Sequence, residues 1–280
     1  MQLRFFRACH GLDTSYTEFA AEARADGYDG LEADVPLDPS TRQSLRDALA
    51  DFDCDFIAEI ATGGGRLPDR RATPAQHHDD FIRQLEVAAE LAPLRINCLA
   101  GCDAWPLAQS RDFLGLLIER ARQLGIPISF ETCRGRSLFT PWATRELVRA
   151  LPELHLTGDF SHWCVVCERL VDSEQEVLEE IAPRVRHLHA RIGNAQGTQV
   201  AHPAAPEHAA ALLAHQRWWA LCWQATAQAG LREFTMTPEF EPLPRQRTPR
   251  FEELKIMPRD LNRWMLRTEH AHFARWLAQR

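Results

Sequence analysis

The chain has 280 residues, of which 45% are hydrophobic and 25% charged, and 32 basic residues against 39 acidic ones give a formal net charge of -7. This composition is typical of a soluble globular protein and excludes a disordered, collagen-like or low-complexity chain. No apolar stretch approaches the roughly 18 residues of a membrane helix, and the first residues lack the features of a signal peptide. We therefore expect a cytoplasmic protein that binds no membrane.

Apolar segments of strand length alternate with helix-like segments from one end of the chain to the other. The expected strands are residues 3–9, 28–34, 55–62, 94–101, 126–132, 154–160, 185–192 and 232–240. The expected helices are 14–25 with Asp13 as its N-cap, 44–52, 74–91, 112–124, one that begins at Pro141, 173–182, 206–229 and 258–279. Eight such pairs predict a closed (β/α)8 barrel, and no linker divides residues 1–280, so we expect a single domain. An open Rossmann-type sheet is the alternative, but no G-x-G-x-x-G pattern follows the first strand.

Three irregular segments follow expected strands: residues 63–72, 193–205 and 241–255. Barrel active sites lie at the end of the barrel where the strands terminate, and long loops there often cover the substrate. The last of the three contains several prolines, so a passive rigid connection is the alternative for it.

The basic and thiol residues limit the chemistry. Lys255 is the only lysine and lies in a charged stretch, so Schiff-base catalysis by lysine is not expected. The acidic net charge argues against a nucleic-acid-binding protein. Eight cysteines should be reduced in the cytoplasm, and no Cys/His pair at zinc-finger spacing accompanies Cys164 and Cys167.

Polar residues end four successive expected strands, where they would point towards the mouth of the barrel. Glu131 ends the fifth strand, Asp159 the sixth and Glu239 the eighth, while the seventh carries His187 and His189. His189 lies nearer the mouth and is the expected ligand, whereas His187 would lie one layer deeper. Carboxylates with one imidazole suit a single divalent cation: Mn²⁺, Mg²⁺ or Co²⁺, and less decisively Zn²⁺.

Further side chains near these strand ends are candidate substrate contacts. They are His162, Arg191, Arg134, Trp105 and Glu59. Arg191 shares a face with His189 and would stand above the metal, and Asp159-x-x-His162 places an imidazole one turn from a ligand. Arg134 and Arg136 follow Glu131, and we assign at most one of them to the substrate. Trp105 could stack on a sugar ring, whereas Cys133 is expected as a buried filler and Trp218, Trp219 and Trp223 as core.

The runs S-F-E-T-C-R-G-R, G-D-F-S-H-W, H-L-H-A-R and T-P-E-F, in this order, resemble the xylose isomerase-like TIM-barrel superfamily, in its sugar phosphate isomerase/epimerase branch. The resemblance extends over essentially the whole chain. It implies that Glu131, Asp159, His189 and Glu239 hold one divalent metal, usually Mn²⁺, that the two glutamates form the catalytic acid/base pair, and that His162 contacts the substrate.

The chain also departs from that branch. Cys133 stands where a histidine is usual, and Gly197-Thr198-Gln199 where Gly-Pro-Gln is usual. Ketose 3-epimerases have a substrate arginine six residues after the metal histidine, but this position is Ala195, which leaves Arg191 or Arg134 for that role.

The resulting hypothesis is a metal-dependent isomerase or epimerase that acts on a small sugar-like substrate through proton abstraction next to a carbonyl. A lyase that begins with the same step is an alternative. An apurinic-endonuclease-like phosphodiesterase would need further histidines on strands two to four, which this chain lacks. A non-catalytic barrel that binds metal or ligand is the third alternative, and assembly into a homo-oligomer is left open.

Overall fold

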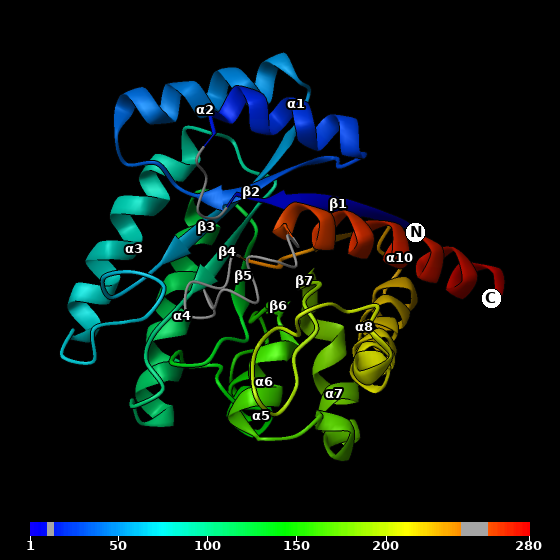
Figure 1. Cartoon of the computed structure of the whole chain (residues 1–280). Helices are drawn as coiled ribbons and strands as arrows, with labels where there is room; N and C mark the ends of the chain where they lie inside the picture. The colour runs from blue at the N-terminus through cyan, green and yellow to red at the C-terminus, as the bar shows by residue number, and fades with distance from the viewer. Residues whose placement is uncertain (10–13, 242–256) are drawn as a thin grey trace, which may run out of the picture.

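A computed structural model describes residues 1–9, 14–241 and 257–280. In this part of the chain eight parallel strands close a barrel in sequential order, with β8 paired to β1, and helices surround the strands (Figure 1). The strands are β1 Gln2–Ala8, β2 Gly30–Asp34, β3 Asp55–Ala61, β4 Arg95–Leu99, β5 Ile128–Glu131, β6 Leu156–Gly158, β7 Val185–His189 and β8 Glu233–Thr237. The predicted (β/α)8 barrel is confirmed.

The helices follow the strands in alternation. They are α1 Tyr16–Asp26, α2 Pro39–Asp51, α3 Pro74–Ala89, α4 Leu107–Gln123, α5 Pro141–Ala150, α6 Phe160–Val166, α7 Gln175–Ile181, α8 Ala209–Gln228 and α10 Pro258–Ala278, with short 3-10 turns η1 Val171–Glu174, η2 Ala182–Arg184 and η3 Pro206–His208. Among the described helices, none combines the length and apolarity needed to cross a bilayer.

Several predicted boundaries are wrong, and the helix caps explain why. Helix α1 begins after Ser15, whose side chain forms a capping box with Glu18, while the predicted cap Asp13 lies outside the described residues. Helix α2 begins five residues earlier than predicted because Asp38 caps it. The sixth strand ends at Gly158 instead of residue 160, since Asp159 caps α6.

The predicted tryptophan cluster of α8 is part of the core. Trp218, Trp219 and Trp223 are each at most 1% exposed. Inside the barrel the strands also bury polar side chains, which gives the lumen hydrogen-bonding groups below the mouth. These are Glu32, Glu59, Asn97, Ser129, Glu131, Thr157, His187, His189, Thr235 and Thr237. Such a polar lumen requires partners for nearly every group, because an unpaired buried polar atom costs stability.

Candidate metal centre

The ends of β5 to β8 bring the four predicted metal ligands together. Glu131 is the last residue of β5 and His189 the last of β7, Asp159 directly follows β6, and Glu239 lies two residues beyond β8. All four side chains are buried, with at most 3% of the surface of each residue exposed. The four side chains come together because the parallel strands of the closed barrel all end at the same edge.

Interatomic distances in this cluster are those of one small ion site. Ligand atoms of Glu131, Asp159 and His189 all lie within 4.8 Å of one another. His189 Nδ1 lies 2.8 Å from Oε2 of Glu239 and 3.9 Å from Oε1 of Glu131. The four groups therefore share one volume at the mouth of the lumen.

The donor set fits a divalent cation. His189 Nδ1 is buried and points at the ligand carboxylates, with Oε2 of Glu239 at 2.8 Å and Oε1 of Glu131 at 3.9 Å. Three carboxylates supply hard oxygen ligands, and one imidazole supplies a nitrogen ligand of intermediate softness. Manganese, magnesium, cobalt and zinc all accept such a set, so the metal identity stays a prediction.

The protonation equilibria of the carboxyl groups differ. Burial raises the pKa of Glu131, and the His189 charge offsets this only in part. Burial would also raise the pKa of Asp159, but the charges of Arg191 and then His162 outweigh it and hold that pKa below its ordinary value. Two neighbouring carboxyls with pKa values shifted in opposite directions are common where acid/base chemistry takes place.

Arg191 lies over the ligand cluster, as its position two residues after His189 predicts. Its Nη2 is 2.5 Å from Oδ2 of Asp159 and 3.4 Å from Oε2 of Glu239. Only 4% of the residue is exposed. The guanidinium therefore pairs with two of the predicted ligands and also lines the cavity beside them.

His162 joins Arg191 from the first turn of α6. Its Nε2 is 3.0 Å from Nη2 of Arg191, 3.5 Å from Oδ2 of Asp159 and 4.0 Å from Oε1 of Glu131. Helix α6 can start directly after β6 because the Asp159 carboxylate accepts the backbone N–H of Ser161 at 3.0 Å. Burial lowers the pKa of His162 to about 4, so the ring is neutral near pH 7.

The thiol of Cys133 lies beside His162, a contact that the sequence did not indicate. Cys133 Sγ lies 3.6 Å from Nε2 of His162. The cysteine is buried, and burial followed by the charge of Glu131 raises its thiol pKa well above the ordinary value. A neutral thiol is a poor nucleophile, so the predicted filler role agrees with its surroundings.

A cavity of about 160 Å³ opens onto this cluster. It is lined by Arg66, Leu67, Leu99, Glu131, Cys133, Arg134, His162, Arg191, Thr198 and Glu241. The predicted substrate residues Arg134, His162 and Arg191 are among them. Arg66, Leu67 and Glu241 were not singled out from the sequence, where the only signal for Arg66 was its place in the glycine-rich segment, and Thr198 was noted only within the run Gly197-Thr198-Gln199.

A scan against protein families matches residues 20–202 to the model of the xylose isomerase-like TIM barrel. The chain belongs to this family. No curated protein matches the sequence.

Solved structures similar to this xylose isomerase-like barrel share its fold at low sequence identity. One is an L-ribulose 3-epimerase, with a TM-score of 0.67 and 12% identity over 99% of this chain and 97% of that one. Another is the D-allulose 3-epimerase from Methylomonas sp. in complex with D-allulose, with a TM-score of 0.64 and 15% identity over 97% of both chains. A third is endonuclease IV from Thermus thermophilus, with a TM-score of 0.60 and 14% identity over 99% of this chain and 100% of that one. At such identities the likeness shows the fold alone.

Within the family barrel, Glu59 is engaged by Arg66. Nη2 of Arg66 lies 2.5 Å from Glu59 Oε1, and its Nη1 lies 3.9 Å from Glu239 Oε1 and 3.7 Å from Glu241 Oε1. Burial would lower the pKa of Arg66, but Glu59 and then Glu239 raise it overall. Glu59, a predicted substrate contact, therefore forms an ion pair with the Arg66 guanidinium, and Arg66 itself lines the cavity.

Of the two arginines after Glu131, only Arg134 lines the cavity. Arg136 is fully buried and donates hydrogen bonds to backbone carbonyls of residues 62, 65, 66 and 101, at 2.6 Å to Thr62 O and 2.9 Å to Arg66 O. It fastens the glycine-rich loop that carries Arg66. The expectation that at most one of the pair contacts substrate is consistent with this division.

Trp105 lies elsewhere than the stacking role requires. Its ring packs edge-on against His77 and Phe113, with centroids 4.7 and 5.2 Å apart. It is absent from the residues that line the cavity over the cluster. The geometry gives the predicted sugar-stacking role no support.

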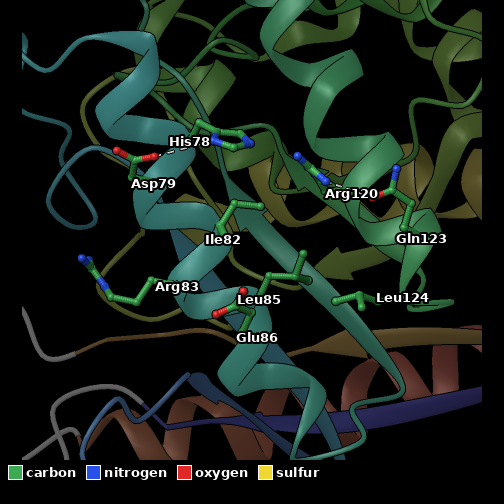
Figure 2. A pocket seen from close by; sticks show the side chains of 9 residues that line it. All are labelled: His78, Asp79, Ile82, Arg83, Leu85, Glu86, Arg120, Gln123 and Leu124. Carbon is green, nitrogen blue, oxygen red and sulfur yellow. Dashed lines mark hydrogen bonds and ion pairs between the residues drawn. The ribbon is translucent and has the colours of Figure 1, made fainter.

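A larger groove lies on the outside of the barrel. It measures about 560 Å³ and runs between α3 and α4, where Ile82, Leu85 and Leu124 contribute apolar walls and Glu86 and Arg120 charged ones (Figure 2). None of the predicted ligands or substrate residues lines it. Size alone therefore does not mark the functional site in this family barrel.

Proposed function

We propose that this protein is a divalent-metal-dependent isomerase or epimerase of a sugar or sugar phosphate. The observation that carries the proposal is the position of two buried glutamates, Glu131 and Glu239, at separate strand ends beside the same buried imidazole, His189. Two carboxyl groups beside one substrate are what proton removal and return require.

The metal would be held by Glu131, Asp159, His189 and Glu239, and we take Mn²⁺ as the first choice. When bound, such a cation supplies Lewis-acid polarisation of a substrate carbonyl. One of the two glutamates removes the proton from the carbon beside that carbonyl, and the other returns a proton. In the metal-free protein burial raises the pKa of Glu131, so this carboxyl takes up a proton more readily than an exposed one.

Donors above the cluster would stabilise the charge that develops on the substrate oxygens. Arg191 and His162 face this space, and Arg134 is the exposed arginine at the rim. An Arg191 donor keeps its positive charge throughout, so it stabilises an enediolate oxygen more than the neutral carbonyl. The similarity to L-ribulose and D-allulose 3-epimerases supports a sugar substrate for this chain too.

The competing reactions use the same fold. A lyase begins with the same proton abstraction, and the products distinguish it from an isomerase. An endonuclease would require histidines on the strands where β3 and β4 of this chain carry Glu59 and Asn97. The net charge of -7 also disfavours a DNA substrate.

The deciding experiment measures the exchange of substrate hydrogen for solvent deuterium. Metal-loaded protein is incubated with a ketose panel that includes D-allulose and L-ribulose in deuterated buffer, and exchange and products are followed by NMR. Glu131→Gln, with its metal content verified, should slow exchange by about 10²–10⁴-fold. Glu269→Gln is the matched control, because Glu269 is equally buried but lies on α10. Wild-type exchange rates in Glu131→Gln would refute the proton-transfer role, and incision of abasic DNA would favour the nuclease instead.

A further inference from the structure

The carboxylate of Glu32 reaches the metal centre from across the lumen. Glu32 is on β2 and the two histidines are on β7, and these strands are not neighbours in the barrel. The side chain is fully buried, with Oε1 3.0 Å from His189 Nε2 and Oε2 3.1 Å from His187 Nε2. Neither the sequence motifs nor the four-ligand set assigns a role to this residue.

Glu32 contacts one nitrogen of His189, and the predicted ligand carboxylates contact the other. An ionised carboxylate only accepts hydrogen bonds, so the contact with Glu32 places a proton on Nε2 of His189. The other nitrogen, Nδ1, is the one that faces Glu131 and Glu239. A metal ion binds the unprotonated nitrogen of an imidazole, and the partner of the opposite nitrogen fixes its orientation.

We propose that Glu32 is a positioning residue of the metal centre, which holds His189 in the Nε2-protonated tautomer with Nδ1 presented to the cation. This inference rests on the proposed metal site but not on the reaction performed there. It assigns a second layer to the site, made by β2, which lies outside the four sequence runs on which the family resemblance was based.

The surroundings of Glu32 hold its carboxylate in place. The Asn97 amide donates to Glu32 Oε1 at 3.2 Å and to Glu131 Oε2 at 3.0 Å, so it joins the positioning carboxylate to a ligand carboxylate. His187 contacts Oε2 through Nε2, and its Nδ1 lies 2.9 Å from Thr235 Oγ1. Three donors around one buried carboxylate offset its loss of hydration.

A second cation is the alternative explanation of this layer. Glu32, His187 and His189 offer three ligand atoms within 4.8 Å of one another. However, the further polar groups beside these three are the Asn97 amide nitrogen, 3.2 Å from Glu32 Oε1, and the Thr237 hydroxyl, 3.3 Å from His187 Nε2, and neither adds a carboxylate, imidazole or thiolate ligand. A cation here would also take the Nε2 nitrogen that must stay protonated. We therefore expect one metal per chain.

The test compares Glu32→Gln and Glu32→Asp with Glu269→Gln, which removes an equally buried carboxylate that accepts from Gln216 and contacts His272. Metal-free proteins are titrated with Zn²⁺ by calorimetry. Glu32→Gln should bind about 10–100-fold more weakly than wild type, Glu32→Asp should recover part of this loss, and Glu269→Gln should match wild type. Nitrogen-15 histidine NMR of the zinc forms should show His189 protonated at Nε2 in wild type, with the signal identified by its loss in His189→Gln.

The outcomes separate the two proposals. Unchanged zinc affinity and an unchanged His189 tautomer in Glu32→Gln would overturn the positioning role and leave the metal centre intact. Two zinc ions per wild-type chain, of which Glu32→Gln loses one, would replace the role by a second metal site. A wild-type protein that binds no metal would overturn the metal centre and this inference together.

Discussion

Arg136 offers the sharpest test of how the loop over the site is held. Replacement by Met keeps most of the side-chain volume and removes the guanidinium that donates to four backbone carbonyls between residues 62 and 101. These carbonyls belong to the glycine-rich loop and to the end of β4. Without Arg136 the loop keeps its hydrogen bonds from Gly63 and Gly64 to Asp80 but loses those that hold the carbonyls of Gly65 and Arg66, so the backbone position from which Arg66 reaches Glu59 is no longer fixed.

The size of the effect follows from these contacts. A hydrogen bond to a charged donor contributes about 1.5–3 kcal/mol, and a buried acceptor left without a partner costs about 1–3 kcal/mol. Burial lowers the pKa of Arg136, which shows that desolvation of its charge opposes these gains. Since water can reach part of the opened loop, we expect a net loss of about 3 kcal/mol in the free energy of unfolding. In a chain of this size that corresponds to a fall of about 6–12 °C in Tm.

Urea unfolding followed by tryptophan fluorescence measures the free energy of unfolding, and hydrogen exchange of residues 62–66 measures the loop locally. Arg134→Met is the matched control, because Arg134 is an exposed arginine at the rim of the same cavity. It should change stability by about 0.5 kcal/mol or less. Equal stability of Arg136→Met and wild type, or an equal loss in Arg134→Met, would refute the clamp.

Three further predictions concern the same molecule. Gly63→Ala should destabilise the protein by about 2–4 kcal/mol in urea unfolding, because Gly63 has a φ of +73° and an added Cβ would lie 2.2 Å from the His77 ring. Gly64→Ala is the control: Gly64 has a φ of +95° and nothing lies within 4 Å of its added Cβ, so only the backbone cost of about 1 kcal/mol is expected. Equal losses in the two variants would contradict the steric argument. Burial lowers the pKa of His77 and of His215 to about 4, so the unfolded state binds more protons between about pH 6.5 and 4. Metal-free protein should therefore lose stability as the pH falls through this window, and His215→Gln should show a shallower slope, by up to about 1.4 kcal/mol per pH unit; an unchanged slope would count against a buried neutral His215. Chelation should abolish activity and lower Tm without changing the far-UV circular dichroism, and Mn²⁺ should restore both; a Tm indifferent to chelator and metal would contradict the site.

The alternation of strands and helices in the sequence was sufficient to predict the barrel and the four residues that end β5 to β8. This succeeded because hydrophobic periodicity is a local property, and parallel strands necessarily deliver their final residues to one edge. Other boundaries were less accurate: Asp38 caps α2 ahead of the predicted segment, and Asp159 caps α6, a helix that was not predicted, through side-chain hydrogen bonds that periodicity does not report.

Only the tertiary structure decided which side chains complete the site. Glu32 is 157 residues from His189 in sequence, and they meet because closure of the barrel places β2 across the lumen from β7. The Cys133 contact with His162 likewise joins the segment after β5 to the first turn of α6, 29 residues further along the chain. A lone buried glutamate in a strand has no sequence pattern that names its partners, because those partners are fixed by the register and closure of the whole barrel. The sequence by itself determined the fold and indicated the candidate ligand residues, and packing across the lumen determined how these side chains are oriented.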